Sequence, residues 1–138
     1  MSQASGNGEQ RQPPDWDAIL PRLASELETE PEMLEAIGRL EAGENAFPED
    51  LLARGRQIFE TACATTAEHL CDDPRVRGLL DANGPRVSEA LTIVPLLFNL
   101  LPDQALRDAS IALIALLVVR MGIGTFCERY SGPHHDAG

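Results

Sequence analysis

The sequence of 138 residues contains no lysine and few aromatic side chains. The first shortage bears on the source of the protein, and the second on the composition of its core. Aromatic residues make up only 4% of the chain, so Leu, Ile, Val and Ala must fill most of a core. All eleven basic residues are arginine, which suits a GC-rich bacterial genome. Alanine and leucine favour helices. Hydrophobic residues make up 43% of the chain, which is enough for one globular domain.

Cysteine is scarce and is present in an odd number, at Cys63, Cys71 and Cys127. The sequence offers no disulfide framework of the kind that staples small secreted domains. Residues 1–14 also lack the apolar stretch of a secretory signal peptide. We therefore expect the protein in a reducing compartment, the cytoplasm, with its cysteines reduced.

Motifs for catalysis, cofactors and metals are missing as well. Cys63 and Cys71 would lie about 12 Å apart along one helix, too far to share a zinc ion, and no C-x-x-C spacing occurs. His69, the only histidine in the expected folded region, would lie on a different side of that helix from Cys63, which argues against a Cys–His nucleophile. Gly122 and Gly124 follow a helix instead of opening one, as a phosphate loop would. The sequence thus predicts no catalytic residue, cofactor or metal site, and it favours a protein that is not an enzyme.

Basic residues are few, and the excess of acidic residues is concentrated in the N-terminal third of the chain. Eleven acids and two arginines between Asp15 and Asp50 give a net charge of −9, whereas residues 51–138 carry −2. An acidic surface repels phosphate backbones and anionic lipid headgroups, so we expect no nucleic-acid partner and no membrane surface. A protein partner with a basic surface fits this charge, and so does solubility alone.

The sequence is well supplied with apolar residues at helical spacing. This periodicity predicts six helical segments, without the alternation that is typical of strands. Thr29 and Glu32 have the spacing of a capping box. Pro21 falls inside the first apolar pattern, so that helix either begins at Pro21 after a short turn or kinks there, and Pro95 should bend the fifth segment. The predicted segments are 15–28, 31–42, 48–71, a short helix from Asp73 to Asn83–Gly84, 85–101, and 103–121 or slightly beyond.

The last segment contains nine consecutive apolar residues, Ile111 to Val119. A helix needs about 20 mostly apolar residues to cross a bilayer, and Arg120 ends this run. We therefore expect a buried core helix. The predicted fold is all-α, a compact bundle of five to six helices around a nearly all-apolar C-terminal helix at about 109–121. The expected domain covers 15–130, between a disordered leader, 1–14, and a flexible tail, 131–138.

These features favour a non-catalytic helical interaction module, such as an adaptor, regulator or small subunit. Its acidic N-terminal face, with Glu28, Glu32 and Glu35, would contact a basic protein partner or a basic patch on another copy of the chain. One alternative is a membrane-associated protein that uses the apolar hairpin 87–127. A second alternative is a small helical enzyme or ligand carrier with a pocket near Pro95.

Overall fold

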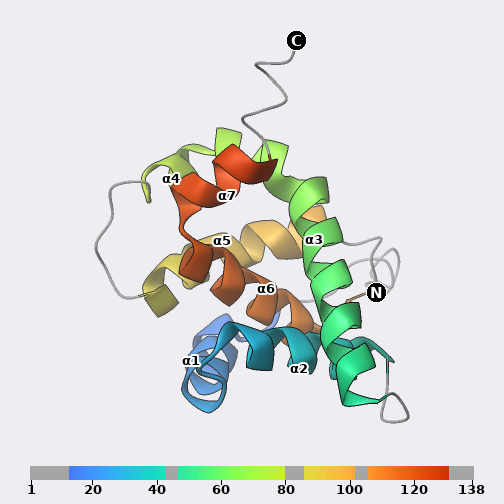
Figure 1. Ribbon diagram of the computed structural model, residues 1–138. Helices are drawn as coiled ribbons and strands as arrows, with labels where there is room; N and C mark the ends of the chain where they lie inside the picture. The colour runs from blue at the N-terminus through green and yellow to red at the C-terminus, as the bar shows by residue number, and fades with distance from the viewer. Residues whose placement is uncertain (1–12, 43–46, 80–85, 102–105, 131–138) are drawn as a thin grey trace, which may run out of the picture.

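The computed structural model describes residues 13–42, 47–79, 86–101 and 106–130, and these form seven helices and no strand (Figure 1). The all-α prediction is confirmed. Asn83, Gly84 and residue 103, where helix bounds were predicted, lie outside the described residues, as do most of the leader and the whole tail. Residues 78–79 and 106–107 were predicted to be helical and are not. The helices are α1 (Trp16–Glu26), α2 (Glu30–Ala42), α3 (Pro48–Asp72), α4 (Pro74–Arg77), α5 (Arg86–Leu100), α6 (Asp108–Met121) and α7 (Ile123–Tyr130).

Helix α6 lies at the centre of the fold, as its composition predicted. Ten consecutive residues, Ser110 to Val119, are buried, and α6 contacts α1, α2, α5 and α7 (Figure 1). Within the described residues no single helix has the length and apolar character needed to cross a bilayer. Helices α6 and α7 together have that character, but the chain bends by 99° between them.

Short-range hydrogen bonds begin α2 as the sequence predicted, and similar bonds begin α4. The Glu32 carboxylate accepts the backbone N–H groups of Glu28 and Thr29 at 2.9 and 3.1 Å, and the Glu32 N–H donates to the Thr29 hydroxyl at 3.2 Å. The Asp73 side chain accepts the Arg75 N–H at 2.8 Å and so caps α4. Both arrangements satisfy backbone donors that the first turn of a helix leaves without partners.

The two prolines lie inside helices, Pro21 in α1 and Pro95 in α5. Both are exposed. A proline inside a helix removes one backbone hydrogen bond, and on the exposed side the freed carbonyl can bond water.

Helices α2 and α3 cross at the backbones of Gly38 and Gly55, and both glycines are buried. A methyl group on Gly38 would collide with the Leu51 carbonyl, and one on Gly55 would collide with the Leu34 carbonyl. Glycine is therefore required at this crossing because nothing larger than hydrogen fits between the two helix backbones.

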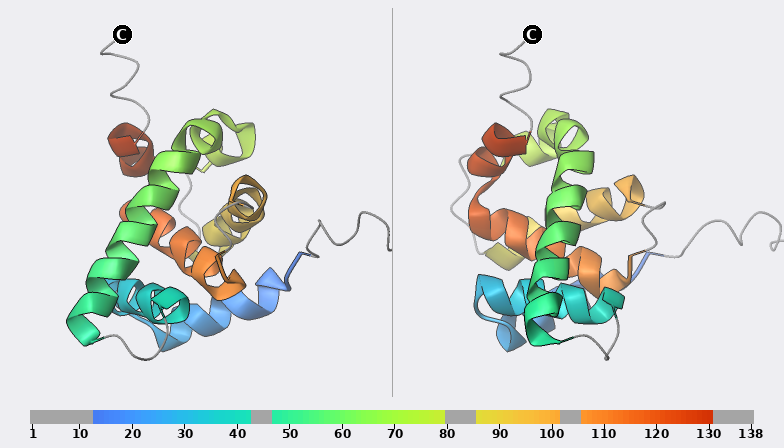
Figure 2. Two further views of the ribbon diagram at one scale, coloured as in Figure 1. Left: turned by 90° about the vertical axis from the view of Figure 1, so that its right-hand side faces the viewer. Right: turned by 45° about the vertical axis from the view of Figure 1, so that its right-hand side comes forward.

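The end predicted for the last helix, at 121 or slightly beyond, is confirmed by the end of α6 at Met121, but the chain after Gly122 is also helical. Gly122 has φ of +103°, a conformation that favours glycine, and its N–H donates to the Val118 carbonyl. The chain then turns and forms α7, a seventh helix where five to six were predicted. Helix α7 lies against the C-terminal half of α3 (Figure 1 and Figure 2).

Candidate functional site

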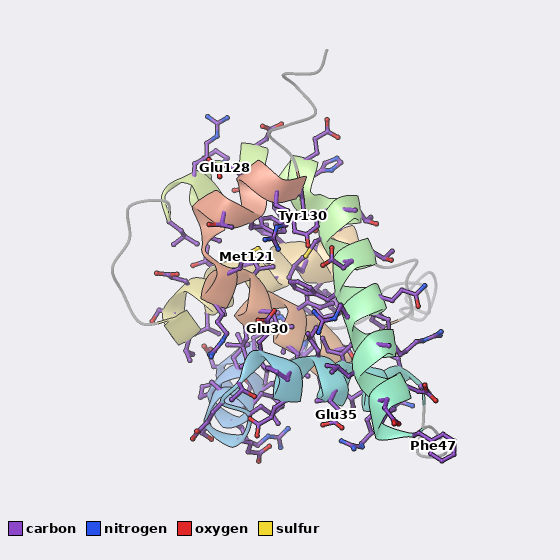
Figure 3. The ribbon with its side chains drawn as sticks, in the orientation of Figure 1. Glu30, Glu35, Phe47, Met121, Glu128 and Tyr130 are labelled. Atoms are coloured by element: carbon purple, nitrogen blue, oxygen red, sulfur yellow. A yellow bond between two sulfur atoms is a disulfide. The ribbon has the colours of Figure 1, made fainter. Side chains whose placement is uncertain are left out.

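The predicted acidic residues lie where α1 passes into α2. We call this region, made of the five glutamates between positions 26 and 35, the acidic corner. Four of the five side chains are exposed, and Glu35 is half-buried. Successive residues of a helix are rotated by about 100°, so the labelled Glu30 and Glu35 leave α2 in different directions (Figure 3). The five residues are Glu26, Glu28, Glu30, Glu32 and Glu35.

Of the three glutamates predicted to bind a partner, Glu32 has a structural task of its own. Its carboxylate holds the start of α2, and the backbone N–H of Glu28, followed by that of Thr29, lowers its pKa. The structure brings Glu28 and Glu32 together through this bond. Glu35 lies one turn further along α2, without a hydrogen bond to either of them.

A second polar cluster joins the end of α2 to the start of α6. One oxygen of the Glu41 carboxylate accepts the Arg107 backbone N–H at 3.0 Å and the Ser110 hydroxyl at 2.6 Å. The Arg107 side chain donates to the Leu40 carbonyl at 3.0 Å. A negative charge thus lies at the N-terminus of α6 and a positive charge at the C-terminus of α2, which is the favourable arrangement for both helix dipoles.

The sequence alone does not reveal this cluster. Glu41 and Ser110 are 69 residues apart, and no local pattern marks either of them as a partner in a hydrogen bond. Only the packing of α2 on α6 brings them together. Their role is structural, because these hydrogen bonds hold the end of α2 on the start of α6.

Two open hollows lie on the surface of the described residues. The first, of about 320 Å³, is lined by Glu41, Arg54, Gln57, Ile58, Thr61 and Leu106. The second, of about 430 Å³, is lined by Glu68, His69, Asp72 and Asp73.

Neither hollow reaches Pro95, where a ligand pocket was an alternative prediction. Although the second hollow gathers three acids and a histidine, the described residues contain no group of His, Cys, Asp and Glu arranged to hold a metal ion.

A disulfide joins Cys71 at the end of α3 to Cys127 in α7, with 5.9 Å between the Cα atoms. The expectation that all three cysteines are reduced is wrong for this pair. The two residues are 56 positions apart, and only the turn at Gly122 brings α7 beside α3. Cys71 is eight residues from Cys63 on the same helix, so the spacing along α3 gave no indication of this pairing.

The third cysteine, Cys63, is buried, and its surroundings argue against a catalytic thiol. Burial, and then the charge of Glu60, raise the pKa of Cys63. A thiol that stays protonated is a poor nucleophile. His69 is exposed and lies in the second hollow with acidic neighbours, so it does not act as a base for Cys63.

Tyr130 connects α7 to α3 close to Cys63 (Figure 3). Its hydroxyl donates to the Glu60 carboxylate at 2.7 Å. Burial and this hydrogen bond raise the pKa of Tyr130. The disulfide and the Tyr130–Glu60 bond thus fasten α7 to α3 at two places.

Comparison with protein-family models, with curated proteins and with solved structures gave no match for this chain.

Proposed function

We propose that this protein is a non-catalytic helical interaction module that contacts a basic surface of another protein through its acidic corner. The observation that carries the proposal is the density of charge. Five glutamates lie within ten residues, without an arginine among them. In the part of the chain that the structure describes, none of the five forms an ion pair. Carboxylates without neutralising partners attract a cationic surface over a distance of about one Debye length.

The acidic corner is held in a defined shape, which supports binding to a folded partner. The capping box holds Glu28, Thr29 and Glu32 together. The rest of α2 packs closely on α3 at the Gly38–Gly55 crossing. A surface that is ordered before binding loses less conformational entropy when the partner arrives.

The environment of the hairpin 87–127 favours this proposal over a membrane-associated protein. The α6 part of the hairpin is enclosed on all sides by other helices. Insertion into lipid would require the whole core to open. The net charge of −11 also opposes anionic lipid surfaces and a second copy of the chain, so a different, basic protein fits best.

We also propose a cytoplasmic location, provided that the disulfide is not permanent there. Disulfides in reducing compartments are rare, and those that occur are usually transient or redox-sensing. In the cytoplasm, the Cys71–Cys127 bond would therefore form only under some conditions.

The test is affinity capture of partners from the native cell with the full chain and two charge variants. The first variant carries Glu28→Gln, Glu30→Gln and Glu35→Gln, and it leaves Glu32 in place because Glu32 caps α2. The matched control carries Glu49→Gln, Glu68→Gln and Glu128→Gln, which remove the same charge from exposed positions elsewhere.

We expect the parent chain and the control to retain the same proteins at low salt and to lose them as the salt concentration rises. The acidic-corner variant should retain none of them, because its charges guide the encounter. Equal capture by all three chains, or capture that is indifferent to salt, would contradict the proposal.

A further inference from the structure

Helix α7 is held on the fold by its buried side chains, by the Tyr130–Glu60 hydrogen bond and by the disulfide. It has eight residues, of which Ile123 and Phe126 are buried. Helices of fewer than about 12–15 residues are only marginally stable by themselves in water. The Gly122 turn leads into α7, and a rotation of the backbone at this glycine would move the helix as a unit. Its position on α3 therefore depends on its contacts there and on the disulfide.

Neither cysteine of the disulfide is fully enclosed by the fold. Cys71 and Cys127 are both only partly buried. Thiol–disulfide exchange requires an attacking thiolate to approach one of the two sulfur atoms. A partly exposed bond between two surface helices meets that requirement.

Helix α7 also covers the remaining thiol. Cys63 is 1% exposed, and Tyr130 and Arg129 of α7 are among the groups that act on its sulfur. Because these two residues come from α7, the movement of α7 away from α3 would open a path from solvent to Cys63.

We propose that the Cys71–Cys127 disulfide is a redox switch whose reduction releases α7 from α3 and uncovers the thiol of Cys63. This regulatory role is independent of the acidic corner, which lies in other helices. In the oxidised protein Cys63 is shielded, and in the reduced protein it becomes available to thiol reagents.

The reducing agent is a dithiol. One of its thiolates attacks a sulfur of the Cys71–Cys127 bond and forms a mixed disulfide, and the other protein sulfur leaves as a thiolate and takes up a proton. The second thiol of the reagent then displaces the remaining protein sulfur. The protein gains two electrons and two protons, and the dithiol becomes its own disulfide.

Burial explains why Cys63 would respond to this change. Burial raises the pKa of its thiol, which keeps the thiolate fraction small. When α7 leaves, water reaches the sulfur, the desolvation is lost, and both the access to Cys63 and its thiolate fraction rise.

The experiment measures the alkylation rate of Cys63 in the full chain by peptide mass spectrometry with iodoacetamide. It compares the oxidised protein, the protein reduced with dithiothreitol, and a Cys71→Ser/Cys127→Ser variant. We expect Cys63 to react at least about tenfold faster in the reduced protein than in the oxidised one. The double variant should react at the fast rate with or without reductant.

A second measurement separates release of α7 from unfolding of the whole chain. Trp16, the only tryptophan, packs edge-on against Phe98 with 5.8 Å between ring centroids, and this contact joins α1 to α5. Its fluorescence should stay unchanged on reduction.

Three results would overturn the proposal. The first is an equal Cys63 rate in the oxidised and reduced proteins, and the second is an oxidised protein that lacks the Cys71–Cys127 link. The third is a change in Trp16 fluorescence that accompanies reduction, because the bond would then hold the entire fold together instead of controlling one helix.

Discussion

Gly38 and Gly55 set how closely α2 and α3 approach. The backbone of each helix occupies the space that a side chain would fill at the glycine of the other helix. A larger side chain at either glycine would therefore push the two helices apart, because a backbone carbonyl cannot move away without the rest of its helix.

We predict that Gly38→Ala destabilises the protein. Its added methyl group would collide with the Leu51 carbonyl, and forcing such an overpacked contact costs about 1–3 kcal/mol. Alanine would return up to about 1 kcal/mol in helix propensity, so the net result is a moderate loss. Chemical denaturation of both proteins would measure the free energy of unfolding.

The matched control is Gly78→Ala. Gly78 is exposed and has φ of −63°, and a methyl group there would meet only ordinary contacts at 3.5 Å or more. This change should leave stability unchanged or raise it by up to about 1 kcal/mol. If the Gly38→Ala protein were as stable as the Gly78→Ala protein, α2 and α3 could separate with little loss of stability, which would contradict the prediction.

The capping box and the glycine crossing differ in how well the sequence predicts them. The Thr29–Glu32 capping box was predicted correctly, because all of its hydrogen bonds lie within one helical turn. The glycine crossing was not predicted, because the partner of each glycine belongs to another helix and a glycine inside a helix has several explanations.

At the scale of elements, six of the seven helices were predicted, and α1, α2, α3 and α5 lie within two residues of their predicted bounds. Helix α4 is shorter than predicted, and α6 begins at Asp108, five residues after its predicted start. Helix α7 was missed. Its eight residues are too few for apolar periodicity to stand out, and Gly122 marks the end of one helix without indicating that another begins directly after it. The contact of α2 with α6 through Glu41 was also invisible, because it joins residues 66 to 69 positions apart.

The docking of α7 on α3 should be visible in the titration of Tyr130, the only tyrosine. Burial, followed by its hydrogen bond to Glu60, raises the pKa of Tyr130 above the ordinary value of 10.0. We therefore predict that the phenolate absorbance of the folded protein appears at higher pH than that of the protein in denaturant.

The sign of the linked stability follows from the same shift. A raised pKa in the folded state contributes stability that is fully present below pH 10.0 and is lost as the pH rises beyond it. Tyr130→Phe should lose less stability over that alkaline range than the parent chain does. Identical titration curves in the folded and denatured protein would mean that Tyr130 does not pack on α3.

At the scale of the whole molecule, one helix organises the core. The apolar run from Ile111 to Val119 predicted a buried α6, and its burial on all sides confirms that prediction. Composition was sufficient here because a helix that is apolar around its whole circumference must be covered on every side. The disulfide was beyond such reasoning, since the pairing of cysteines depends on the complete fold.

We predict that Leu113→Ala, at a fully buried position of α6, costs about 2–5 kcal/mol. This range is a large part of the stability of a typical domain. Thermal unfolding followed by circular dichroism would measure the loss. The control is Leu96→Ala in α5, where the side chain is only half-buried, so a clearly smaller loss is expected. Equal losses at the two positions would contradict the central role of α6.

The disulfide also changes the topology of the covalent chain. With Cys71 joined to Cys127, the backbone between them becomes a closed ring that contains α4, α5 and α6, whereas α1 and α2 lie on a branch outside it. A ring of this size lowers the entropy of the unfolded chain by the equivalent of roughly 4 kcal/mol. A protease that cuts once within the ring opens it without releasing a fragment. The oxidised chain therefore keeps its central helix tethered to α3 even after it has been cut or unfolded.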